Sequence, residues 1–193
     1  SLLTSSISAM YRMLRIVATG FLLTSPFAVL GPSTPASAAL SDSDGDGKLE
    51  ITSCNDLFTE LDGGTSSTPK TGDYELLPAD STFDCTSGSP RSPMGYFSGS
   101  LDGNGVTLAD LSIACSSGTC GLFQYIVGSA TISDLSFSGP SVTNTGTGIG
   151  TGVLSGAVPG WGNASGVTVS DITITGGTVS GADSTGSVVG WAD

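Results

Sequence analysis

An acidic segment near the start of the chain has the side chains best suited to bind a metal ion. It begins at Asp42 and reads Asp-Ser-Asp-Gly-Asp-Gly. Carboxylates therefore stand at its first, third and fifth positions and a glycine at its sixth, as in an EF-hand-type calcium loop. A carbonyl at position seven and an acid at position nine extend this set of oxygen ligands, so the segment predicts a Ca²⁺ site. Its ligands are Asp42, Asp44, Asp46, the carbonyl of Lys48, and Glu50.

The segment departs from the EF-hand pattern at position twelve. A bidentate glutamate is expected there, but Ser53 occupies the position. Asp56 is the nearest acid that could replace it. The alternative interpretation is a solvated acidic linker that binds no specific ion.

The sequence lacks the side chains that the common enzymatic mechanisms need. The chain contains no histidine, which removes the Ser-His-Asp arrangement and the usual general base near neutral pH. Zinc hydrolysis lacks ligands, and no basic cluster exists to hold an acidic sugar. We therefore expect no enzymatic activity. A polysaccharide-degrading enzyme with paired carboxylates is the weaker alternative.

Four cysteines follow the first 50 residues, and an even number of cysteines in a secreted chain indicates disulfides. Three pairings are possible. We favour the pairing that is local in sequence, Cys54–Cys85 and Cys115–Cys120. The first would staple an N-terminal cap, and the second would close a four-residue loop. Zinc binding is the weaker alternative, because only one pair of cysteines is closely spaced.

The N-terminus has the pattern of a secretory signal peptide. Arg12 and Arg15 provide a basic start, residues 16–30 are mainly apolar, and Ala36-Ser37-Ala38 resembles a cleavage site. A membrane anchor is the alternative, but the apolar run is short for a bilayer span. We assign residues 1–38 to the signal peptide and upstream residues, and expect a secreted, extracellular or cell-surface protein.

The charge of the chain restricts its partners. Seventeen acidic residues face five basic ones, which gives a net charge of −12. Nucleic acid is excluded as a partner, because phosphate binding requires a basic face. We expect the partners to be cations and cell-surface or extracellular matrix components, glycans among them.

Residues 39–96 are predicted to precede the main body of the fold. Residues 39–53 form the acidic calcium-type loop, and residues 54–96 form an N-terminal cap region. A short helix is expected over residues 52–61, because Leu57, Phe58 and Leu61 share one face, with Thr52 or Ser53 as its N-cap. Residues 74–77 read as a short strand.

Residues 97–193 contain internal repeats. The segments VTLADLSI, ATISDLSF and VTVSDITI begin at residues 106, 130 and 167, spaced 24 and then 37 residues apart. Apolar residues alternate with Ser and Thr in each, which is typical of half-buried strands, and the phase of the alternation shifts at the aspartate. Repeats too small to fold alone must stack, so the sequence predicts an all-β solenoid. An antiparallel sandwich is the alternative.

Four segments resemble parts of secreted surface proteins of bacteria and archaea that carry the GLUG motif. They are residues 42–51, the stretch FSGSLDGNGVTLADL at 97–111, and the Gly-x-x-x-Gly segments at 152–156 and 186–190. The resemblance implies a right-handed parallel β-helix in an adhesin-like or structural protein, with no catalytic residues. Together with the helix at residues 52–61, the expected fold is a right-handed parallel β-helix with a short N-terminal α-helical cap.

The chain departs from the GLUG repeats at three positions where asparagine is common. These positions carry Asp110, Asp134 and Asp171. We expect their carboxylates to cap backbone N–H groups at bends of the chain.

Two tryptophans are candidate ligand-binding residues. Trp161 and Trp191 each follow a glycine, and both could stack on sugars in a carbohydrate-binding module, although packing in the core is the more common role of tryptophan.

Rows of threonines are compatible with ice binding, but the uneven repeat spacing argues against a regular face. The sequence ends at Asp193 inside a repeat, so we expect it to be part of a longer protein.

Overall fold

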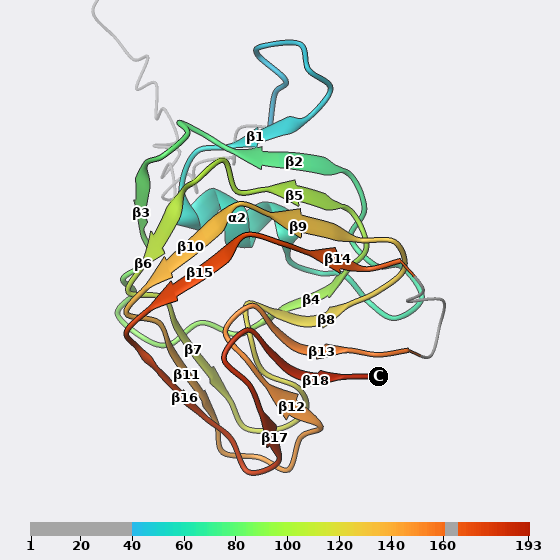
Figure 1. Ribbon diagram of the computed structural model, residues 1–193, viewed down its shortest axis with the longest axis vertical. Helices are drawn as coiled ribbons and strands as arrows, with labels where there is room; N and C mark the ends of the chain where they lie inside the picture. The colour runs from blue at the N-terminus through green and yellow to red at the C-terminus, as the bar shows by residue number, and fades with distance from the viewer. Residues whose placement is uncertain (1–39, 161–165) are drawn as a thin grey trace, which may run out of the picture. The chain divides into compact units, whose positions relative to one another are not determined.

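The computed structural model describes residues 40–160 and 166–193. Within these residues the regular structure consists of short parallel strands and a single helix (Figure 1). The predicted all-β class and the presence of one short helix are therefore confirmed. The predicted signal peptide, residues 1–38, lies outside the described residues, as does Trp161.

The strands form five sheets in which every pairing is parallel. The first sheet contains β1 (Leu49–Ile51), β2 (Asp73–Leu76), β5 (Ser100–Asp102), β9 (Thr131–Ser133) and β14 (Thr168–Val169), in that order. The second sheet contains β3 (Thr82–Asp84), β6 (Thr107–Ala109), β10 (Leu135–Ser138) and β15 (Ile172–Thr175). The third sheet contains β7 (Ser112–Cys115), β11 (Ser141–Asn144) and β16 (Thr178–Ser180).

The two remaining sheets complete the path of the chain. The fourth sheet pairs β12 (Gly150–Thr151) with β17 (Ser184–Thr185). The fifth contains β4 (Met94–Phe97), β8 (Phe123–Ile126), β13 (Ser155–Val158) and β18 (Val189–Ala192). The chain visits the sheets in the same order each time, which gives four circuits: β2–β4, β5–β8, β9–β13 and β14–β18 (Figure 1).

Parallel pairing begins earlier in the chain than the repeats do. Strands β2, β3 and β4 lie within or at the end of the predicted cap region, yet they pair with β5, β6 and β8 of the second circuit. The predicted strand at residues 74–77 corresponds to β2. Asp80, with φ of 55°, lies at the bend between β2 and β3, but the residues before it do not match the repeated motif, so the repeats do not reveal the first circuit.

Apolar side chains from successive circuits lie in register and form the core. In the second sheet, Phe83, Leu108, Phe137 and Ile174 are paired in one column. The first three are at most 5% exposed, whereas Ile174 in the last circuit is half-buried. Since successive side chains point to opposite faces of a strand, the neighbouring Ser and Thr residues face outward. Each circuit therefore covers the apolar side of the previous one.

Bends between sheets use backbone conformations in the left-handed region. Asp134 and Asp171, with φ values of 52° and 53°, lie between strands of the first and second sheets, and Asp110, with φ of 55°, lies between the second and third. Among the hydrogen bonds of the described residues, none joins these carboxylates to a backbone N–H, so the expected capping role is wrong. Aspartate fits here because it tolerates the left-handed region better than most residues.

The register also corrects the first repeat spacing. The motif at residues 106–113 spans the bend from the second to the third sheet, whereas the motifs at 130–137 and 167–174 span the bend from the first to the second. Leu108 pairs with Phe137, not with Ile132. The spacing of 37 does correspond to one circuit, because Leu135 pairs with Ile172.

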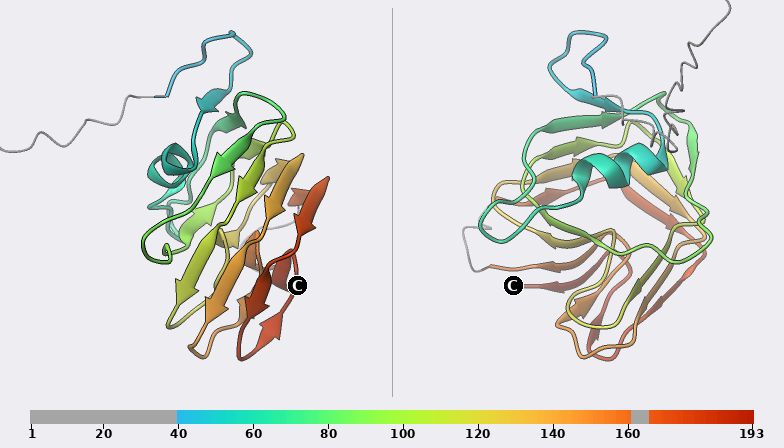
Figure 2. Two further views of the ribbon diagram at one scale, coloured as in Figure 1. Left: turned by 90° about the vertical axis from the view of Figure 1, so that its left-hand side faces the viewer. Right: turned by 180° about the vertical axis from the view of Figure 1, so that it is seen from behind.

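Helix α2 (Cys54–Leu61) lies across the end of the first circuits (Figure 2). Ser53 is its N-cap and accepts a hydrogen bond from the N–H of Asp56 at 3.1 Å. Leu57 and Leu61 are buried on its inner side. The helix predicted over residues 52–61 is therefore confirmed, with a start two residues later.

Both predicted disulfides are present. Cys54, at the start of α2, is bonded to Cys85 just after β3. Cys115, at the end of β7, is bonded to Cys120 and closes a short loop. No helix of the described residues has the length and apolar character that a bilayer span requires.

Candidate metal centre

The acidic loop between Leu40 and β1 is closed by its own first carboxylate. Asp42 accepts hydrogen bonds from the backbone N–H of Gly45 at 2.7 Å and of Gly47 at 3.0 Å. Both glycines have positive φ, 82° and 92°, a conformation that glycine adopts without steric cost. The Asp-x-Asp-Gly-Asp-Gly spacing therefore produces the sharp loop that the sequence predicts.

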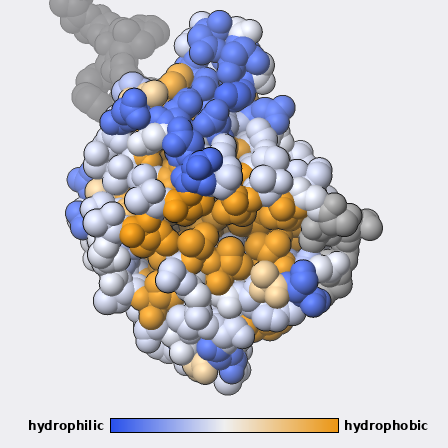
Figure 3. All heavy atoms as spheres, in the orientation of Figure 1, coloured by the Kyte–Doolittle hydropathy of each residue, from blue (hydrophilic) through white to orange (hydrophobic). Residues whose placement is uncertain are grey.

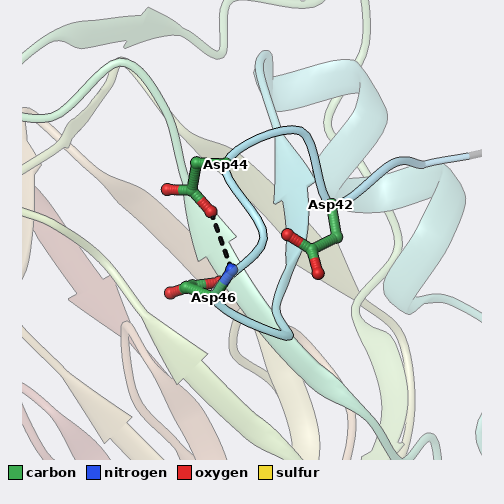
Figure 4. Close-up of side chains that lie close together, drawn as sticks. All are labelled: Asp42, Asp44 and Asp46. Atoms are coloured by element: carbon green, nitrogen blue, oxygen red, sulfur yellow. Dashed lines mark hydrogen bonds between the residues drawn. The ribbon is translucent and has the colours of Figure 1, made fainter.

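The three alternating carboxylates of this loop converge. Asp44 accepts from the N–H of Asp46 at 3.1 Å (Figure 4). Asp46 accepts from the N–H of Lys48 at 2.8 Å. Asp42, Asp44 and Asp46 each bring one oxygen within 4.8 Å of the others, and all three are exposed. This arrangement of hard oxygen donors suits a calcium ion, which accepts irregular geometry.

Glu50 closes the base of the loop. Its backbone N–H donates to the carbonyl of Ser41 at 3.0 Å, and its Oε1 accepts from the N–H of Ser43 at 2.8 Å. Glu50 also belongs to a second group of converging carboxylates, with Asp44 and Glu75, whose oxygens lie within 4.8 Å of one another. Asp44 is common to both groups.

Glu75 is a member of the site that the sequence did not indicate. It lies on β2 and is only 4% exposed. Its Oε2 accepts from Nδ2 of Asn104 at 2.9 Å, while its Oε1 has no hydrogen-bond partner. The only signal in the sequence is an acid between the apolar residues Tyr74 and Leu76, and that signal does not show which face the side chain takes.

Lys48 contributes a side chain as well as its predicted backbone carbonyl. Its ammonium lies 3.0 Å from Asp102, 3.4 Å from Asp46 and 3.9 Å from Glu75. The hydrogen bond to Asp102 is the main cause that raises the pKa of Lys48 above its ordinary value, while partial burial opposes it. The lysine therefore neutralises one side of the acidic cluster.

Asp56 does not complete the loop. Its carboxylate accepts hydrogen bonds from the hydroxyls of Ser53 at 2.7 Å and Thr52 at 3.2 Å, at the start of α2. Neither group of converging carboxylates includes it. The suggestion that Asp56 replaces the missing twelfth ligand is therefore wrong, because the residue serves the helix N-terminus.

Only one of the two tryptophans, Trp191, lies in the part of the chain that the structure describes. Trp191 lies on β18, is half-buried, and pairs with Ala157 of β13. Trp161 falls in the gap between residues 160 and 166. The proposal that they form a ligand-binding pair stays a prediction.

A hollow of about 310 Å³ lies at the open side of the last circuit, with Pro140, Val153, Ile174 and Val179 in its lining. Its lining contains no ionisable side chain. Apolar side chains gather on the same side of the molecule (Figure 3). The hollow offers apolar surface but no group for acid–base chemistry.

No protein-family model, curated protein or solved structure matches this chain.

Proposed function

We propose that the chain belongs to a secreted, adhesin-like or structural protein of the cell surface, whose body is a right-handed parallel β-helix stabilised by calcium at its acidic loop. The observation that carries the proposal is the column Phe83–Leu108–Phe137–Ile174, in which one residue per circuit stacks in parallel register. Stacked repeats build extended surfaces, which solenoid proteins use for binding.

Two further observations support an extracellular role. The disulfides Cys54–Cys85 and Cys115–Cys120 leave no free cysteine in the structure, and disulfides persist in oxidising compartments. The absence of histidine from the sequence supports a non-enzymatic role. The resemblance of residues 97–111 to GLUG-motif proteins agrees with this assignment.

Fractionation of the source cells tests the location. We expect an antibody against the protein to label intact cells or the medium, and external protease to remove the cell-bound signal. Detection only in the cytosol would overturn the proposal.

A glycan array tests the binding role and the carbohydrate-binding alternative together, with Trp191→Ala as the variant that should lose any sugar stacking.

Ice binding is a second candidate, because the outer face of the second sheet is more regular than the repeat spacing suggests. Thr107, Ser136 and Thr173 are paired in one column, and Ser138 pairs with Thr175 in the next. The variable lengths of the circuits are absorbed outside this sheet, so the hydroxyl-bearing side chains repeat at the strand spacing of about 4.8 Å. A thermal-hysteresis measurement that gives no activity would remove this candidate.

A further inference from the structure

Glu75 occupies an unfavourable environment for a carboxylate. It is almost fully buried, and Oε1 has no hydrogen-bond partner. A buried charged oxygen without a donor is costly, and native structures normally pair such groups. The unpaired oxygen therefore points to a partner that is missing from the protein atoms.

The register of the first sheet places further negative charge next to Glu75. Glu50 on β1 pairs with Glu75 on β2, and Glu75 pairs with Asp102 on β5. Three acids thus occupy one column, where like charges on neighbouring strands repel. The ammonium of Lys48 lies close to Asp102 and Glu75, but no basic side chain of the described residues forms an ion pair with Glu50.

Asp44 adds a fourth carboxylate near Glu50 and Glu75, at the part of the column where Glu50 has no basic partner among the described residues. It extends from the acidic loop, and one oxygen each of Asp44, Glu50 and Glu75 lies within 4.8 Å of the others. Hydrogen bonds of the described residues engage only Oδ1 of Asp44 and Oε1 of Glu50. Each of these residues therefore retains an oxygen that can bind a cation.

We propose that Asp44, Glu50 and Glu75 form a calcium site that fastens the acidic loop to the first circuit. Glu75 adds a buried carboxylate from β2, outside the acidic loop. A divalent ion with oxygen ligands and tolerant geometry fits this set better than Mg²⁺, which requires a near-ideal octahedron. The inference rests on the proposed calcium binding of the loop and adds the residue that joins loop and body.

Calcium titration by isothermal calorimetry on the purified protein tests the site. We expect Glu75→Gln to weaken Ca²⁺ binding at least about tenfold, since calcium affinity follows the number of charged ligands. The glutamine keeps the volume and an oxygen for Asn104. Asp73→Asn is the matched control, because Asp73 lies on the same strand, is exposed and belongs to neither group of carboxylates. It should bind calcium as the wild type does.

The outcomes separate this inference from the proposed function. If Asp42→Asn weakens binding while Glu75→Gln does not, the loop binds calcium alone and the Glu75 site is overturned. If the wild type binds no calcium, the Glu75 site and calcium binding by the loop are both overturned, while the surface location remains to be tested by fractionation. Should Glu75→Gln fail to fold, Glu50→Gln tests the same site. Trypsin cleavage after Lys48 adds an independent measurement, since calcium should slow it in the wild type, and equal rates with calcium and with chelator would contradict the site.

Discussion

Asp134 shows how one residue determines a bend between sheets. Its φ of 52° lies in the left-handed region, as does the φ of 53° of Asp171 one circuit later. The flanking register, in which Leu135 pairs with Ile172, places the two aspartates at equivalent positions. Aspartate here is selected by the backbone conformation that it tolerates, because its carboxylate makes no hydrogen bond to a backbone N–H among the described residues.

Substitution at Asp134 should therefore follow backbone preference. We expect Asp134→Ala to lower the free energy of unfolding by about 1 kcal/mol, because alanine resists the left-handed region. Asp134→Gly should cost less, since glycine adopts positive φ freely. Urea unfolding of both variants measures the difference. A glycine variant less stable than the alanine variant would show that the carboxylate itself stabilises the bend.

Three side chains determine how the stability of the fold should respond to alkaline pH. Burial raises the pKa of Tyr74 and of Tyr96 above 10.0, and the hydrogen bond to Asp102 raises the pKa of Lys48 above 10.5. The folded state thus holds these protons more tightly than the unfolded state does. Their contribution to stability is complete below pH 10 and is lost as the pH rises through the folded pKa values.

We expect the urea midpoint to fall as the pH rises from about 9 to about 12, with most of the fall above about pH 10. Tyr74→Phe should show a smaller fall, because one of the three titrating groups is removed. A midpoint that is constant over this range would contradict the assignment.

At the scale of elements, the two disulfides differ in what they constrain. Cys54–Cys85 spans 31 residues and joins α2 to the end of β3, while Cys115–Cys120 spans only 5. In the chain-entropy model, closing the longer loop removes more freedom from the unfolded chain. The longer bridge attaches the start of helix α2 to the end of β3.

Removing the longer bridge should therefore cost more stability. We expect the Cys54→Ala, Cys85→Ala double variant to lose about 4 kcal/mol and the Cys115→Ala, Cys120→Ala variant about 2 kcal/mol. Chemical denaturation under non-reducing conditions measures both. The opposite order would indicate that the short loop at Cys115 is needed for the pairing of the third sheet.

The sequence predicts the local features of this fold better than the register in which its strands pair. Helix α2, its cap Ser53 and both disulfides follow from residue type and spacing. The equivalence of residues 106–113 and 130–137 is wrong, because the same strand–Asp–strand pattern can form either of two bends. Glu75 was missed because its contact with the loop depends on the pairing of β1 with β2, which no local pattern specifies.

At the scale of the molecule, stability should decrease from the inner circuits toward the last one. Leu108 and Phe137 lie between neighbouring circuits and are almost fully buried. Ile174 occupies the same column in the fourth circuit but is half-buried. Apolar surface that remains exposed does not stabilise the folded state. Equivalent residues of different circuits therefore contribute different amounts to the free energy of unfolding.

Alanine substitutions along this column measure that gradient. We expect Leu108→Ala to cost between about 2 and 5 kcal/mol, the range for a buried leucine, and Ile174→Ala to cost less than about 2 kcal/mol because its burial is partial. Equal costs would mean that the last circuit is covered in solution, for instance by a second copy of the chain.

A crystal structure of the protein grown with calcium, with anomalous data, tests the central claim most directly. We expect parallel circuits in the register of Leu108 with Phe137, and a calcium peak with oxygens of Asp44, Glu50 and Glu75 at about 2.3–2.6 Å. An antiparallel sandwich would contradict the fold. Parallel circuits without an anomalous peak at Glu75 would contradict the proposed attachment of the acidic loop by calcium.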